Sequence, residues 1–178
     1  MSVKAKNIQA TIKIPNADEY TSGELAAIGQ DIVNFIRKRT EQGIDKDGNQ
    51  FKGYSKSYEK SLDFKIAGKS SQVDLKLSGD MLAMLRVLET KKNTVKIGYE
   101  TDDAEAGRAE GNQIGSYGKP RANSSKARPF IGIDSEQLKA ILAKYPLDND
   151  AKREKRAEKV NAGRDLSGAI VDELFGED

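Results

Sequence analysis

Three oxygen-bearing side chains alternate in the segment GIDKDGNQF, and this spacing is typical of a calcium-binding loop. Asp45, Asp47 and Asn49 fall at its first, third and fifth positions. Such a loop also needs glycine at its sixth position and a bidentate glutamate at its twelfth, where this chain has Gln50 and Lys56. We therefore predict that the segment holds no metal and is a turn with an Asp-Gly pair at its corner.

The residue types on which most catalytic and metal sites depend are missing. The chain has no Cys and no His, which excludes thiolate sites, zinc sites and histidine-based triads. Catalysis would rest on carboxylates such as Asp102, Asp103 and Glu105, for which no paired nucleophile and base is evident. Gly68-Lys69-Ser70 resembles the end of a phosphate loop, but the first glycine of that motif would stand at Asp63. The sequence therefore predicts a protein that is not an enzyme and has no cofactor.

The composition is polar for a chain of this length. Hydrophobic residues make up 37% and charged residues 33% of the 178 residues, and the net charge is +2. This near balance lacks the basic excess of a dedicated nucleic-acid binder. The first residues include lysines where a signal peptide would be apolar, and no segment approaches the ~20 apolar residues of a membrane span. We expect a soluble protein, made in a cytoplasm, with no membrane partner.

The spacing of apolar residues predicts an α+β core domain over residues 1–146. Thr21 and Glu24 have capping-box spacing and open a long helix over about 22–42. A second helix is expected at 135–145. The predicted sheet is small and mainly antiparallel, and its strands are expected at about 8–14, 86–91, 94–100 and 128–133. Both helices would pack on this sheet.

The remaining core segments are shorter or irregular. Ser55 and Ser78 could each cap a short helix, and Val73, Leu75 and Leu77 alternate as in a strand or an extended arm. Residues 102–112 are acidic and small, and we assign them no element. Residues 115–128 form a long loop rich in Gly and Ser, which we expect to become ordered only in an assembly.

Two basic segments could meet a negatively charged partner. The long loop carries four cations, Lys119, Arg121, Lys126 and Arg128. A cationic loop suits a negatively charged protein surface or DNA, but a simple solubilising loop explains the same composition. The second segment, 152–156, is explained better as a solvated helix whose glutamates pair with neighbouring cations.

Residues 147–178 are predicted to form a separate helical tail. A polar helix at 151–160 is followed by a glycine break and an apolar stripe. The stripe consists of Leu166, Ile170, Val171, Leu174 and Phe175. An isolated amphipathic segment usually docks on a protein surface, which could be its own domain or a groove of a neighbouring subunit.

Four pieces of the chain, read in order, resemble the phage virion morphogenesis (tail completion) proteins of Mu-like tailed phages. They are the long helix with its GIDKDGNQF turn, the helix start LSGDMLAML, TVKIGYE followed by AEGNQIG, and ARPFIGID before the last helix. The resemblance covers roughly residues 22–145 and rests mostly on RPFIGI and the turn. AEGNQIG has no His, where many relatives carry one.

The resemblance implies a structural protein of the virion. It would form a homo-oligomeric ring, six-fold or twelve-fold, in the neck that joins the portal or connector to the tail terminator or tail tube. Genomic DNA could pass through the ring, and the subunit would occupy the host cytoplasm during assembly. The residues also leave open an alternative, a small nucleic-acid-binding module that uses basic loop 119–128 and basic helix 152–159.

Overall fold

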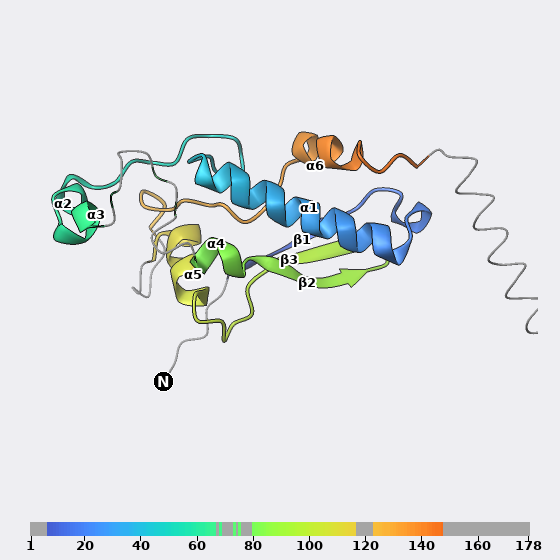
Figure 1. Cartoon of the computed structure of the whole chain (residues 1–178), viewed down its shortest axis with the longest axis horizontal. Coiled ribbons are helices and arrows are strands. Elements are labelled where there is room, and N and C mark those ends of the chain that lie inside the picture. The colour runs from blue at the N-terminus through green and yellow to red at the C-terminus, as the bar shows by residue number, and fades with distance from the viewer. Residues whose placement is uncertain are drawn as a thin grey trace, which may run out of the picture. The chain divides into compact units, whose positions relative to one another are not determined.

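The computed structural model describes residues 7–66, 68, 73, 75, 80–116 and 123–147. The chain divides into two units, Met1–Tyr145 and Pro146–Asp178. The polar helix expected at 151–160 and the apolar stripe expected at 166–175 lie outside the described residues, as do Lys119, Arg121, Leu77 and Ser78. The described residues are drawn in colour in Figure 1, and the first unit has the α+β class that the sequence predicts.

The elements of the first unit follow one another in a mixed order (Figure 1). They are β1 (Gln9–Lys13), a 3-10 turn (Ala17–Glu19), α1 (Ser22–Glu41), α2 (Lys56–Glu59), α3 (Leu62–Ile66), α4 (Asp80–Met84), β2 (Arg86–Lys91), β3 (Thr94–Gly98), α5 (Ala106–Ile114) and α6 (Ser135–Leu142). The predicted long helix and the predicted hairpin are confirmed. The predicted last helix ends three residues early, at Leu142.

The sheet has three antiparallel strands in the order β1-β3-β2. The central strand β3 places Val95 and Ile97 in the core, where both are fully buried. Ile97 pairs with Ala10 of β1 and with Val87 of β2, and the register shifts between Val87 and Glu89. The alternation of apolar residues seen in the sequence therefore marks the buried face of the sheet.

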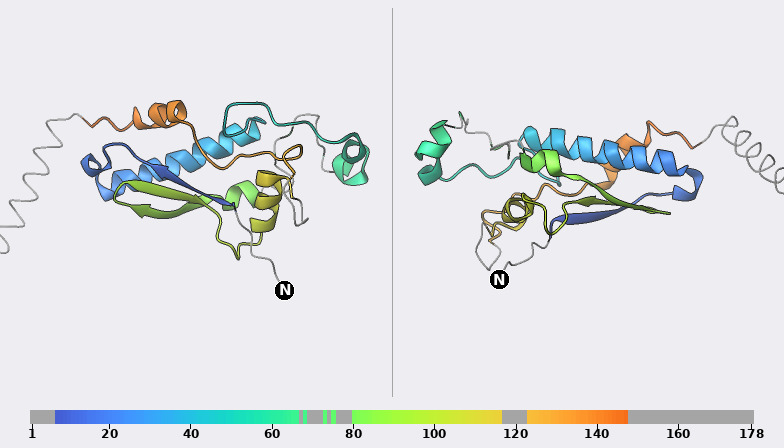
Figure 2. Two further views of the ribbon diagram at one scale, coloured as in Figure 1. Left: turned by 180° about the vertical axis from the view of Figure 1, so that it is seen from behind. Right: turned by 60° about the horizontal axis from the view of Figure 1, so that its bottom comes forward.

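Helix α1 lies along one face of this sheet (Figure 2). Its capping box forms as predicted, since the Glu24 amide donates to Thr21 Oγ1 at 3.2 Å and the Thr21 amide donates to Glu24 Oε2 at 2.9 Å. At Gly29 a Cβ atom would lie 3.0 Å from side-chain carbons of Val87 and Val95. The absence of a side chain at Gly29 therefore lets the helix pack closely on the sheet at this point.

The fourth predicted strand, 128–133, does not form. The amides of Phe130 and Ile131 donate to Gln113 Oε1 at 3.0 and 3.1 Å. The carbonyls of Phe130 and Gly132 accept hydrogen bonds from Arg39 Nη2 at 2.7 and 3.0 Å. Because side chains satisfy these backbone groups, the segment is buried without a strand partner.

Helix α5 lies in the segment to which the sequence assigned no element. Ala106 and Ala109 are buried on one of its faces, and alanine has the highest helix propensity. Gly115 ends the helix in the left-handed conformation, with φ 73°. The small residues of 102–112 therefore allow close packing of a helix where we expected an irregular segment.

The segment 52–66, which we call the arm, leads from α1 toward α4. Helices α2 and α3 pack on each other and lie beyond the C-terminal end of α1 in all three ribbon views (Figures 1 and 2). The ring centroids of Tyr54, Tyr58 and Phe64 are 5.2 to 5.5 Å apart. Leu62 and Ile66 remain 71% and 76% exposed. The arm therefore has a small aromatic core and an exposed apolar side.

Candidate functional site

The segment GIDKDGNQF is a closed turn in the structure. Asp45 Oδ1 accepts hydrogen bonds from the amides of Asp47 and Asn49 at 2.9 and 2.8 Å. Gly48 has φ 85°, which fits the predicted Asp-Gly corner. The amide of Phe51 then donates to Gly43 O at 2.7 Å. Across the described ranges, no group of three or more Asp, Glu, His or Cys side chains is placed to hold a metal ion.

The carboxylates considered for hydrolysis have separate partners. Asp103 accepts hydrogen bonds from Arg86 Nη1 at 2.8 Å and from the amide of Glu100 at 2.7 Å. The Arg86 guanidinium lowers the pKa of the Asp103 carboxyl. Glu105 instead pairs with Arg108 at 3.0 Å. Asp103 therefore fixes the turn after β3, and Glu105 belongs to the groove described next.

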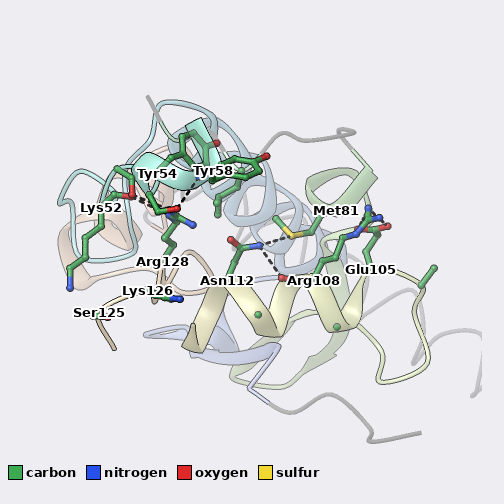
Figure 3. A pocket seen from close by; sticks show the side chains of 16 residues that line it. Lys52, Tyr54, Tyr58, Met81, Glu105, Arg108, Asn112, Ser125, Lys126 and Arg128 are labelled. Carbon is green, nitrogen blue, oxygen red and sulfur yellow. Dashed lines mark hydrogen bonds and ion pairs between the residues drawn. The ribbon is translucent and has the colours of Figure 1, made fainter. Parts of the chain in front are cut away.

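An open groove of about 1040 Å³ lies between the arm, helix α5 and the segment 125–128 (Figure 3). Tyr54 and Tyr58 line it from the arm, and Met81 lines it from α4. Its charged lining consists of four cations and one carboxylate, which are Lys52, Arg108, Lys126, Arg128 and Glu105. The groove is therefore both aromatic and electropositive.

Arg128 ties the arm to the rest of the groove. Its Nε donates to Lys52 O and its Nη2 donates to Gly53 O, both at 3.2 Å. Its guanidinium carbon lies 5.3 Å from the centroid of the Tyr54 ring, within cation–π range. Its amide donates to Asn112 O at 2.7 Å. Arg128, predicted as a partner-facing cation, therefore also has a structural role.

The α5 wall of the groove is partly bare backbone. Gly107 and Gly111 are four residues apart, so they share one face of the helix, and both line the groove. A Cβ atom at Gly107 would meet nothing within 4 Å. Asn112 Nδ2 lies 2.9 Å from Arg108 O and 3.7 Å from Met81 Sδ, which joins this wall to α4.

The chemistry of the groove suits binding. The hydroxyl of Ser55 caps α2 by accepting from the Tyr58 amide, and that of Ser125 donates to Asn123 Oδ1. These hydroxyls thus have structural partners. The tyrosine rings and the cations line a space large enough for a polypeptide segment. The arrangement fits a ligand that is negatively charged and partly apolar.

Tyr99 anchors α4, and with it the Met81 side of the groove. The Tyr99 ring is fully buried and its hydroxyl donates to Met81 O at 2.6 Å. Burial raises the pKa of the Tyr99 phenol far above its usual value of 10.0. The folded state therefore holds the phenolic proton at a pH where the unfolded chain releases it.

Tyr99→Phe is expected to remove part of the alkaline sensitivity of the fold. Below pH 10, the pKa of tyrosine in the unfolded chain, the Tyr99 phenol should not lower the wild-type free energy of unfolding. Above pH 10 this group should lower that free energy by about 1.4 kcal/mol per pH unit. Urea unfolding between pH 8 and about pH 11 would measure the slope for both chains. Tyr58→Phe, at a half-buried position in the arm, is the matched control. Parallel slopes for wild type and Tyr99→Phe would contradict this role.

Comparison of the chain with protein-family models, with curated proteins and with solved structures gives no match. None of the helices in the described ranges is long and apolar enough to cross a membrane. The groove, the arm and the order of the sequence motifs are therefore the features that indicate a function.

Proposed function

We propose that this chain is a structural virion protein of a tailed phage, which forms a homo-oligomeric ring in the neck and joins the portal to the tail. The observation that carries the proposal is the arm, with exposed Leu62 and Ile66 beside an electropositive groove. The order of the four sequence motifs supports the same function. Portal or connector proteins and tail terminator or tail tube proteins would contact the two faces of the ring, and genomic DNA would pass through it.

An arm of this kind suits a subunit that interlocks with others. Helices of four and five residues are too short to be stable alone, so the aromatic cluster and Arg128 must hold them. Burying Leu62 and Ile66 at an interface would contribute about 1.5–3 kcal/mol each, before the cost of ordering. Exposed apolar side chains on a supported projection are typical of interaction sites.

The nucleic-acid-binding alternative has weaker support. It relies on the loop cations, but the Arg128 guanidinium is held by Lys52 O, Gly53 O and the Tyr54 ring. Steep loss of DNA affinity with rising salt would favour the alternative.

The double variant Leu62→Ser/Ile66→Ser is expected to prevent ring formation while the domain stays folded. Light scattering and negative-stain images of the purified full chain would show rings for wild type and small particles for the variant. Lys60→Ser/Lys65→Ser changes exposed residues of the same arm and is the matched control. Wild-type particles that remain at the 19.5 kDa of one chain would contradict the proposed function.

Truncation after Pro146 is expected to leave a folded domain that assembles poorly. The buried apolar residues of the described core all precede Pro146, and Ile141 is the last of them. The predicted polar helix of ten residues would span about 15 Å, enough to reach a neighbouring subunit with the apolar stripe. Thermal unfolding and particle size test this on the truncated chain. A collapse of its melting temperature would place the stripe in its own core, and unchanged rings would show that the tail is dispensable for assembly.

A further inference from the structure

We propose that the groove between the arm and α5 receives residues 165–178 of a neighbouring copy. The inference rests on the proposed ring and names the contact that joins one copy to the next. It follows from the chemistry of the groove, from the charge of the segment and from the length of chain before it.

The groove offers two kinds of contact along one surface. Tyr54, Tyr58 and Met81 provide apolar area, and four cations surround it against a single carboxylate. That carboxylate, Glu105, is already paired with Arg108 at 3.0 Å. A segment that fits must bring apolar side chains and several negative charges together.

Residues 165–178 have this composition. The sequence DLSGAIVDELFGED carries the apolar stripe and five acidic residues, with no Lys or Arg. Residues 170 and 174, and 171 and 175, are four apart, so a helical segment would present them on one face. The segment is strongly acidic in a chain whose net charge is +2, which makes it complementary to the groove.

A neighbouring copy satisfies the geometry of a ring. A groove and a complementary segment on one chain are the two halves of a heterologous contact, which closes into a ring when every copy gives one segment and receives another. Residues 148–164 separate the described domain from the segment, and with ten of them in the predicted polar helix and the rest extended they would span up to about 40 Å. The connection is therefore long enough for an exchange between copies.

A nucleic acid fits the groove less well than this segment does. A phosphate backbone could pair with the cations, but it would offer no apolar partner to Met81 and Leu75 in the lining. An acidic amphipathic polypeptide segment uses both the apolar and the cationic lining. The experiment must therefore distinguish binding of DNA in the groove from binding of residues 165–178.

Gly107→Gln tests the groove without removing any contact. The substituted residue is the second of α5 and has open space around its Cβ position, so the glutamine side chain would occupy the groove. Gly23→Gln is the matched control, because Gly23 is the second residue of α1, also has nothing within 4 Å and lies outside the groove lining. We expect Gly107→Gln to raise the concentration needed for half-assembly by at least about tenfold, and Gly23→Gln to leave it unchanged.

Engineered disulfides identify the occupant directly, because the full chain contains no cysteine. Ala104→Cys places a thiol on an exposed residue of the groove lining, and Ser167→Cys places one beside the stripe. In the double variant, exchange between copies should give a ladder of covalent multimers on mild oxidation. The ladder should disappear when Gly107→Gln is added and persist with Gly23→Gln. Each single-cysteine variant controls for random coupling.

The outcomes separate this inference from the proposed function. A covalent product that stays monomeric would mean that the segment occupies its own groove, which overturns the inference. Rings without disulfides would overturn it as well, while the proposed function stands. Particles that are neither oligomeric nor cross-linked would contradict both. If the wild-type chain binds duplex DNA, Gly107→Gln loses this binding and the double-cysteine variant forms no disulfides, the groove would be assigned to nucleic acid instead.

Discussion

Arg39→Ala is expected to lower the free energy of unfolding by about 3–5 kcal/mol, a large fraction of the stability of a domain this size. Arg39 is only 4% exposed, near the end of α1. Its guanidinium donates to Gln137 Oε1 at 2.7 Å and to the carbonyls of Phe130 and Gly132. Removal of the side chain would leave two largely buried carbonyls without their donor and would open a cavity beside Phe35.

Burying the charge of Arg39 costs free energy, and the hydrogen-bond acceptors around its guanidinium offset this cost. Burial lowers the pKa of the guanidinium, while Asp45, Asp134 and Asp47 oppose this shift. The group nevertheless stays charged at any ordinary pH, because its unperturbed pKa is so high. Its value to the fold lies in the fork of donors, which satisfies a segment that has no strand partner.

Two further variants isolate this effect. Lys38→Ala changes the neighbouring exposed residue and should alter the free energy of unfolding by less than about 0.5 kcal/mol. Arg39→Lys keeps the positive charge but lacks the planar guanidinium with its several donors. It should therefore recover only part of the free energy of unfolding that Arg39→Ala loses. Denaturant unfolding of the four chains provides the comparison. A loss for Arg39→Ala no larger than that for Lys38→Ala would show that other groups hold the 130–132 segment.

The same residue explains why one predicted strand was wrong. RPFIGID has the apolar run of a short strand, and local pattern gives no sign that its backbone groups are satisfied from elsewhere. Arg39 is 91 and 93 residues away from the carbonyls that it binds. Gln113 is 17 and 18 residues away from the amides that it binds. In the sequence, Arg39 is simply one of the cations in the last turn of a helix, where cations suit the helix dipole. The conformation of this segment is therefore determined by tertiary contacts, which the local sequence pattern does not show.

Local signals were sufficient where the interactions are local. The capping box of Thr21 and Glu24 and the cap at Ser55 each join residues three apart, so the sequence pattern contains both partners. The hairpin of β2 and β3 is also a short-range element. The helix α5 was missed because its buried face consists of alanines, which give little hydrophobic periodicity.

The candidate site was predictable only in part. Lys126 and Arg128 were identified as cations of a partner surface, and both line the groove. The Tyr54 ring packs against Tyr58 and Phe64 and lies under Arg128, which the local sequence pattern does not indicate. The α5 wall had no signal, since Gly107 and Gly111 line a groove only because the arm and α5 lie side by side. A groove assembled from separate segments has no compact sequence signature.

Gly98→Ala is expected to lower the free energy of unfolding by about 2–4 kcal/mol, because this position combines a positive φ with a backbone contact. Gly98 is buried at the end of β3 and has φ 143°. A Cβ atom there would collide with Ile8 O and would lie 2.8 Å from the Cα of Gln9. Both obstacles are main-chain atoms, so a side-chain rotation cannot relieve them.

The collision falls where β1 joins the sheet. The amide of Tyr99 donates to Ile8 O at 3.1 Å, and Gln9 Nε2 donates to Tyr99 O at 2.9 Å. Displacing Ile8 to accommodate a methyl group would therefore stretch the first pairing of β1 with β3. Because Tyr99 also holds Met81, we expect faster hydrogen exchange at β1 together with loss of order on the α4 side of the groove.

Gly107→Ala is the matched control for this prediction, since it makes the same chemical change where a Cβ atom meets open space. Alanine has the higher helix propensity, so this control should be neutral or should raise the free energy of unfolding by up to about 1 kcal/mol. Denaturant unfolding of both variants, followed by hydrogen exchange on the β1 amides, separates a local collision from a general effect of replacing glycine. Equal changes in the two variants would mean that β1 can shift away from Gly98 at little cost. The strand would then be a mobile edge of the sheet.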